Sequence, residues 1–188
     1  MCPIRPNVIW AMDFQFDTTA DGRRIGGVMM DLRNITLRFG GVTSLNDVTL
    51  QMRRGEILGF AGLMGAGRTE VARAIFGADP LDAGTIRLGD RTLSIASPRD
   101  AIREGIAYLS EDRKGDGLAL KMTVADNITL PSMDKVSGAA GFIRFGQEQE
   151  VARDYIARLS IRTPSARQVT RLLSGGNQQK IVIAKWLY

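Results

Sequence analysis

Gly62-Leu63-Met64-Gly65-Ala66-Gly67-Arg68-Thr69 is the most informative stretch of the chain. It follows an apolar run at 57–61 and precedes a segment at 70–76 with helical periodicity, which predicts a strand, a glycine-rich loop and a helix. Glycines let backbone N–H groups turn toward one point, and the helix adds the positive end of its dipole there. The spacing fits the phosphate-binding loop G-x-x-x-x-G-K-[ST], with arginine in the lysine position.

This loop predicts nucleotide binding together with impaired hydrolysis. Arg68 keeps the positive charge, but its planar guanidinium reaches phosphates differently from a lysine ammonium. The hydroxyl of Thr69 would meet Mg²⁺. A glycine-rich turn that binds no ligand is the alternative. The candidate nucleotide-binding residues here are Gly62, Gly65, Ala66, Gly67, Arg68, Thr69 and Glu70.

Composition narrows the class of protein. The chain has 188 residues, 44% of them hydrophobic and 24% charged, which is ordinary for a globular domain. Its net charge is +5, but the basic residues are scattered and no basic run with interleaved aromatics is present, so we expect no nucleic-acid partner. The sequence contains no histidine and a single cysteine, which excludes a histidine base, a disulfide framework and a cysteine metal cage. No apolar run is long enough for a membrane span and no secretory signal is visible, so we expect a cytoplasmic location.

The coarse organisation is a β-rich half followed by a helical half. Residues 1–29 show no clear period and are expected to form an extension or linker, and alternating apolar residues then predict two antiparallel strands joined at Gly40-Gly41. A hairpin is expected over 85–93, a helix after the Ser97-Pro98 cap, and a short buried strand at 106–109.

The second half begins with a charged segment. We expect a loop at 112–117, a helix capped by Thr123-x-x-Asp126, loop-like residues at 131–146 and a helix over about 147–160.

A second glycine loop, Leu173-Ser174-Gly175-Gly176-Asn177-Gln178-Gln179-Lys180, opens an apolar helix. Backbone N–H groups and a serine hydroxyl converge at its start, which predicts a second anion site. The alternative is an N-capped helix with two flexible glycines.

These residues resemble a known family. The stretch 173–180 is similar to the LSGGQ signature of ABC ATPases, and 62–70 and 110–118 resemble motifs of the ATP-binding subunits of ribose-, galactose- and xylose-type importers. The resemblance covers about residues 30–187 and is to the second ATP-binding domain. It implies an α/β P-loop NTPase fold with an antiparallel β subdomain and a helical subdomain at about 119–188, within a partial ATP-binding domain over 30–188.

The resemblance also implies roles for individual residues. Phe39 corresponds to the aromatic that stacks on adenine, with a core strand residue as the alternative. Glu111 stands at the Q-loop glutamine position, where it would sense the γ-phosphate and contact the membrane partner; a solvated turn carboxylate is the alternative. Ser174, Gly175 and Gly176 resemble the residues that clamp ATP held by the opposing domain. The implied cofactors are ATP and Mg²⁺, with Thr69 and Glu111 as metal-side residues.

The implied function is the ATP-binding component of a bacterial monosaccharide importer. Its partners would be a second ATP-binding domain in a head-to-tail dimer, transmembrane permease subunits and, indirectly, a periplasmic sugar-binding protein. The location would be cytoplasmic, on the inner face of the membrane.

Two departures from the family pattern leave an alternative open. The sequence ends after the signature helix, before the Walker B strand, so we expect a C-terminally incomplete domain with negligible hydrolysis and unpaired edges on the strands near 57–61 and 106–109. Residues 37–42 look more like the opening of a first or stand-alone domain. A non-catalytic nucleotide-binding remnant or regulatory module is therefore the competing interpretation.

Overall fold

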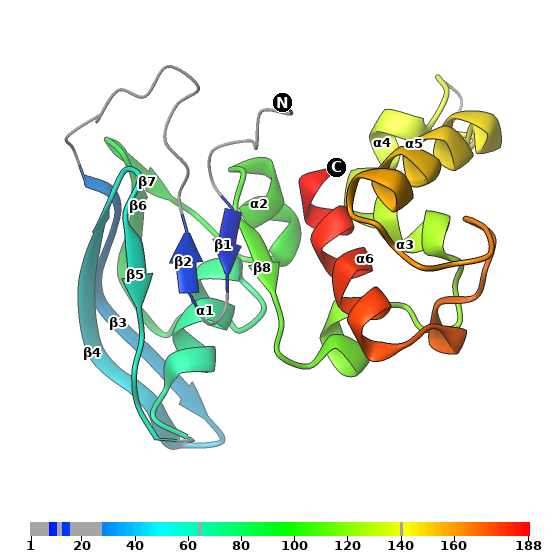
Figure 1. The fold of residues 1–188 in the computed structure, drawn as a ribbon. Helices are drawn as coiled ribbons and strands as arrows, with labels where there is room; N and C mark the ends of the chain where they lie inside the picture. Colours follow the sequence, from blue (N-terminus) through cyan, green and yellow to red (C-terminus); the bar gives the residue numbers. More distant parts are fainter. Residues whose placement is uncertain (1–7, 11–12, 16–27, 64, 140) are drawn as a thin grey trace. The chain divides into compact units, whose positions relative to one another are not determined.

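A computed structural model describes residues 8–10, 13–15, 28–63, 65–139 and 141–188 (Figure 1). The chain divides into two compact units, Met1–Tyr108 and Leu109–Tyr188, and each is described by itself. The first unit holds the strands and the first glycine loop, and the second is helical.

The first unit is built on an antiparallel sheet with the strand order β4-β3-β6-β7. β3 (Val28–Phe39) and β4 (Val42–Arg53) form a long curved hairpin, as the alternation of apolar residues predicts (Figure 1). β6 (Ala83–Leu88) and β7 (Arg91–Leu93) form the predicted second hairpin. One face of this sheet is buried through Met30, Leu32, Ile35, Leu37, Leu45, Met52 and Ile86.

The strand before the glycine loop is β5 (Ile57–Gly59), and α1 (Arg68–Phe76) follows the loop. α1 ends at Gly77, which forms the C-cap in the left-handed conformation with a φ of 71°. Within the helix, Val71, Ile75 and Phe76 are buried. α2 (Pro98–Arg103) begins after Ser97 with proline in its first turn, as expected. The buried strand predicted at 106–109 is β8 (Ala107–Leu109).

Our expectation of unpaired strand edges is wrong for one edge of each strand. β2 (Asp13–Gln15) pairs antiparallel with β5, with Phe14 opposite Leu58, and β1 (Val8–Trp10) pairs with β8. Two strands therefore lie inside the N-terminal segment that we expected to be an extension or linker. Each of the two strands that we expected to lack partners thus has one paired edge, which reduces the length of bare strand edge in the described part of the chain.

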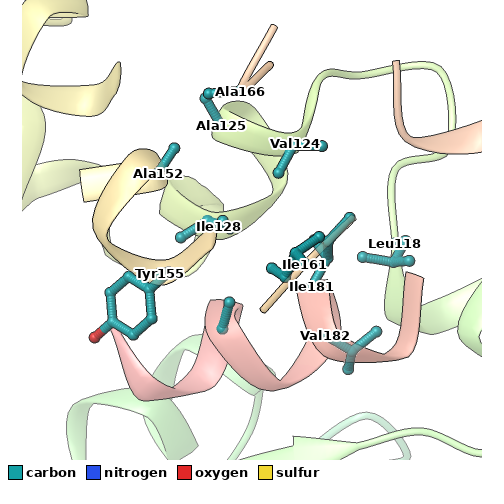
Figure 2. Packing of buried hydrophobic residues seen from close by; sticks show 11 residues of the cluster. Leu118, Val124, Ala125, Ile128, Ala152, Tyr155, Ile161, Ala166, Ile181 and Val182 are labelled. Carbon is teal, nitrogen blue, oxygen red and sulfur yellow. The ribbon is translucent and has the colours of Figure 1, made fainter. Parts of the chain in front are cut away.

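The second unit is a helical cluster around α3 (Val124–Thr129), α5 (Phe145–Arg158) and α6 (Gly175–Leu187). The predicted capping box is present: Thr123 accepts the Asp126 N–H and Asp126 accepts the Thr123 N–H. Figure 2 shows the apolar core between these helices. Its buried members are Leu118, Val124, Ala125, Ile128, Ala152, Tyr155, Ile161, Ala166, Ile181, Val182 and Ala184.

Asn127 is the polar centre of this unit and is fully buried. Its Nδ2 donates to the Ala119 carbonyl at 3.0 Å, to the Thr123 carbonyl at 2.9 Å and to Thr170 Oγ1 at 3.1 Å. Its Oδ1 accepts the Ala119 N–H at 2.8 Å. This one amide therefore ties α3 to the chain on both sides of the helix, with its donors and acceptor satisfied.

Short helical turns replace two of the expected loops. Residues expected to be a charged loop form a π-helical turn, η1 (Arg113–Gly117), because the Asp112 carboxylate accepts the N–H groups of Lys114 and Gly115. The segment expected to be loop-like contains η2 (Leu130–Ser132) and α4 (Met133–Val136). η3 (Thr170–Leu172) precedes the second glycine loop. None of the helices in the described part of the chain has the length and apolar character that crossing a membrane requires.

Candidate functional site

The first candidate site is the loop between β5 and α1. Gly65 and Gly67 have φ angles of 82° and 87°, in the left-handed region that other L-residues rarely adopt. Gly67 caps α1 without any side-chain hydrogen bond to the first helical turn. The first N–H groups of a helix need partners from outside the helix, so this end of α1 can receive the oxygens of an anion.

The loop is held in place by β4. A Cβ on Gly67 would lie 2.9 Å from Leu45 Cδ2, so the loop backbone packs directly on a buried residue of the β3–β4 hairpin. Phe39 lies at the turn of that hairpin, opposite Val42, and is 46% exposed. The alternative in which Phe39 is a core residue is therefore wrong, and the hairpin carries an exposed aromatic ring.

Arg68, Thr69 and Glu70 form the first turn of α1, and all are half-buried. The Arg68 stem lies over the loop, since its Cδ would be 3.8 Å from a Cβ on Gly62. Leu63, in the same loop, is 86% exposed. The helix thus begins with one guanidinium and one hydroxyl at the glycine loop. Phosphate oxygens and a threonine hydroxyl are ligands that Mg²⁺ accepts, so Thr69 fits a metal bound through a nucleotide.

The second candidate site is the start of α6. Ser174 occupies the N-cap position, with extended backbone, but its side chain makes no capping hydrogen bond. α3 provides the contrast within the same unit, because its Thr123–Asp126 capping box satisfies N–H groups at its start. α1 and α6, which follow the two glycine loops, lack such a cap, so both predicted anion sites keep outward-facing donors.

η1 and α6 are joined by two cationic side chains. Arg113 Nη1 donates to the Gly175 carbonyl at 3.4 Å, and its guanidinium lies where a Gly175 Cβ would be, with Nη2 2.7 Å from that point. Lys185 Nζ donates to the Gly117 carbonyl at 3.1 Å. Burial lowers the pKa of Lys185. No local sequence pattern indicates these contacts, since each joins residues more than 60 positions apart.

Asn177 makes a further contact that the sequence analysis missed. Its Nδ2 donates to Ser174 Oγ at 2.9 Å, and its Oδ1 accepts the Arg162 N–H at 2.8 Å. The serine–x–x–amide spacing is the available signal, because it is the spacing of a capping box.

Glu111 lies in the second unit and is exposed. Its carbonyl accepts the Arg113 N–H at 3.1 Å, so it adjoins the turn that contacts α6. The loop at 62–69 belongs to the first unit. No group of three or more metal-ligating His, Cys, Asp or Glu side chains occurs among the described residues.

Comparison with known proteins agrees with these motifs. Residues 45–188 match the family model for the ABC transporter. A putative ribose/galactose/methyl galactoside import ATP-binding protein 1 from Agrobacterium fabrum is 67% identical over 143 residues, covering 76% of this chain and 28% of that protein. A putative ribose/galactose/methyl galactoside import ATP-binding protein 3 from Burkholderia cenocepacia is 61% identical over 161 residues, covering 86% and 30%. The chain thus spans less than a third of the length of these two relatives.

Solved structures agree with the fold. A nucleotide-free ATP-binding cassette from an ABC transporter matches with a TM-score of 0.64 at 18% identity, covering 86% of this chain and 65% of that one. The ADP conformation of an ATP-binding cassette matches with a TM-score of 0.61 at 17% identity and the same coverage. The α/β P-loop fold that the resemblance implies is confirmed. From its motifs and its family match over most of its length, the chain belongs to the ABC transporter family.

Proposed function

We propose that the chain is the ATP-binding part of a bacterial importer of monosaccharides. The names of its relatives, which are putative ribose/galactose/methyl galactoside import ATP-binding proteins, support this substrate class. The observation that carries the proposal is the pair of glycine loops, each followed by a helix that no side chain caps. Such helix starts bind phosphate through backbone N–H groups.

The loop at 62–69 would hold the phosphates of ATP. Its N–H groups and the Arg68 guanidinium would contact phosphate oxygens, and the Thr69 hydroxyl would reach the Mg²⁺ that accompanies them. Phe39, exposed on the hairpin that supports the loop, would stack on adenine. Glu111 would act on the metal side of a nucleotide, as the resemblance implies.

The loop at 174–176 would act on a partner. Ser174, Gly175 and Gly176 would clamp ATP held by a second ATP-binding domain, in a head-to-tail dimer. Permease subunits and, through them, a periplasmic sugar-binding protein would complete the importer, with this chain on the cytoplasmic face of the membrane. ATP binding and hydrolysis in the dimer would then drive transport.

Calorimetry with Mg-ATP tests the first loop. A charge-assisted hydrogen bond contributes about 1.5–3 kcal/mol, so Arg68→Ala should weaken binding by about 10- to 150-fold. Arg153→Ala is the matched control, since Arg153 is an exposed arginine whose Nε bonds a carbonyl of its own helix. Unchanged affinity in Arg68→Ala, or no binding by well-folded protein, would refute the assignment.

A further inference from the structure

We propose that Asn177 is a positioning residue that sets the direction of the Ser174 hydroxyl proton, so that the proton is left for a phosphate oxygen. The inference rests on the proposed role of the 174–176 loop as an ATP clamp. Asn177 lies next to the serine and glycines of that loop and acts by donating a hydrogen bond to the Ser174 hydroxyl oxygen.

Two hydrogen bonds fix the orientation of the Asn177 amide. The Arg162 backbone N–H is only a donor, so the atom that faces it at 2.8 Å has to be the carbonyl oxygen Oδ1. Nδ2 then faces Ser174 Oγ, at 2.9 Å. Because an amide NH₂ has no acceptor capacity, Ser174 Oγ can only accept this bond.

A serine hydroxyl that accepts a hydrogen bond still carries one proton to donate. That proton cannot be directed to Asn177, and Ser174 is exposed, with no acceptor for it among the described residues. In an ordinary N-cap the serine oxygen would instead accept a backbone N–H of the first turn. Here the asparagine side chain takes that place, so the backbone donors of Gly175 and Gly176 also keep no side-chain cap.

The start of α6 therefore presents mainly hydrogen-bond donors to an incoming ligand. A hydroxyl proton, backbone N–H groups and the positive end of a helix dipole together match the oxygens of a phosphate. A cation or a neutral sugar would leave several of these donors unsatisfied. The outermost phosphate of ATP on a partner domain is the group that we expect to be bound.

The Asn177→Asp variant tests the direction of the bond. A carboxylate oxygen still accepts the Arg162 N–H, but the other oxygen now takes the Ser174 proton that the phosphate would have received. The substitution also adds one negative charge. Gln179→Glu, at an exposed position of the same helix, adds the same charge without contacting Ser174 and is the matched control.

The assay is the affinity for Mg-ATP and for Mg-ADP of the full chain mixed with a separately expressed ATP-binding cassette whose P-loop carries lysine. Ser174→Ala and Asn177→Asp should each weaken ATP binding by about tenfold or more, the loss of one hydrogen bond to a charged group. ADP binding should change little, because ADP lacks the outermost phosphate. This discrimination between ATP and ADP is a readout that a general loss of structure would not produce.

The outcomes separate this inference from the proposed function. If Ser174→Ala leaves ATP binding unchanged, the proposed clamp is wrong. If Ser174→Ala weakens binding while Asn177→Asp behaves like Gln179→Glu, the clamp stands and the positioning role is overturned. Side-chain amide exchange in the unmodified chain gives a test that needs no variant: the Asn177 NH₂ should exchange more slowly than that of the exposed Asn46, and equal rates would also overturn the role.

Discussion

Replacing Gly67 by alanine probes how the P-loop is built. An L-residue at its φ of 87° costs about 1–2 kcal/mol. The added Cβ would also lie 2.9 Å from Leu45 Cδ2, and Leu45 is only 4% exposed, so it cannot move into solvent. Overpacking of this kind costs about 1–3 kcal/mol. Together the two effects predict a loss of about 3 kcal/mol in the free energy of unfolding of Gly67→Ala.

Gly65→Ala is the control that separates the two effects. Gly65 has a similar φ, 82°, but a Cβ there would meet no atom within 4 Å. Gly65→Ala should therefore lose only the free energy of backbone strain, about 1–2 kcal/mol. This loss is partly offset by about 0.4–1 kcal/mol, because alanine restricts the unfolded chain more than glycine does. Urea titration followed by tryptophan fluorescence and circular dichroism measures both variants under one set of conditions.

The comparison has a definite refuting result. If Gly65→Ala and Gly67→Ala lose the same stability, the packing of the loop on β4 is not as described. A double variant, Gly67→Ala with Leu45→Val, should recover part of the loss because the shorter side chain makes room for the new methyl group. Strict additivity of the two substitutions would argue against direct contact between these residues.

Three other predictions concern the scaffold around the sites. Asn127→Ala should lower the free energy of unfolding by about 3–5 kcal/mol in a urea titration, because it leaves several buried hydrogen-bonding groups unpaired, whereas a loss below about 1 kcal/mol would contradict the described network. Burial lowers the pKa of Lys185 below 10.5, so the unfolded chain binds more protons than the folded chain in the pH window just below 10.5. The free energy of unfolding of the unmodified protein, relative to that of Lys185→Met, should therefore rise with pH across that window. A flat or falling difference would refute this prediction. Deletion of residues 1–15 should raise hydrogen exchange at Leu58 and Tyr108, since β5 and β8 would lose their partner strands; unchanged protection by mass spectrometry would show that β1 and β2 do not pair as described.

Local signals predicted the elements that depend on neighbouring residues. The β3–β4 alternation, the proline at the start of α2 and the Thr123–Asp126 capping box each act within a few residues, and all three were confirmed. The pairing of β2 with β5 was missed because a strand of three residues carries no pattern, and its partner lies about 44 positions away. The helical turn at 113–117 was missed although its cause is local, because the Asp112 carboxylate accepts two of its N–H groups.

The two loops of the candidate site could be located from glycine spacing alone. Their fine structure could not, because it depends on residues far along the chain. Two of these contacts join different elements: Leu45 packs against Gly67, and Arg113 lies beside Gly175. No periodicity in the sequence indicates them. The Asn177–Ser174 bond is local, but its spacing equally predicts an ordinary cap. The roles of Phe39 and Glu111 toward a nucleotide stay predictions.

Amide chemical shifts on addition of Mg-ATP show whether the uncapped start of α1 binds phosphate. The N–H resonances of Gly65, Gly67 and Thr69 should shift in a saturable way. Those of Val124 and Asp126, at the capped start of α3, should not shift, because the capping box already occupies that helix end. Saturable shifts confined to other parts of the chain, or no shifts at the α1 loop at ATP concentrations that saturate related cassettes, would contradict the account.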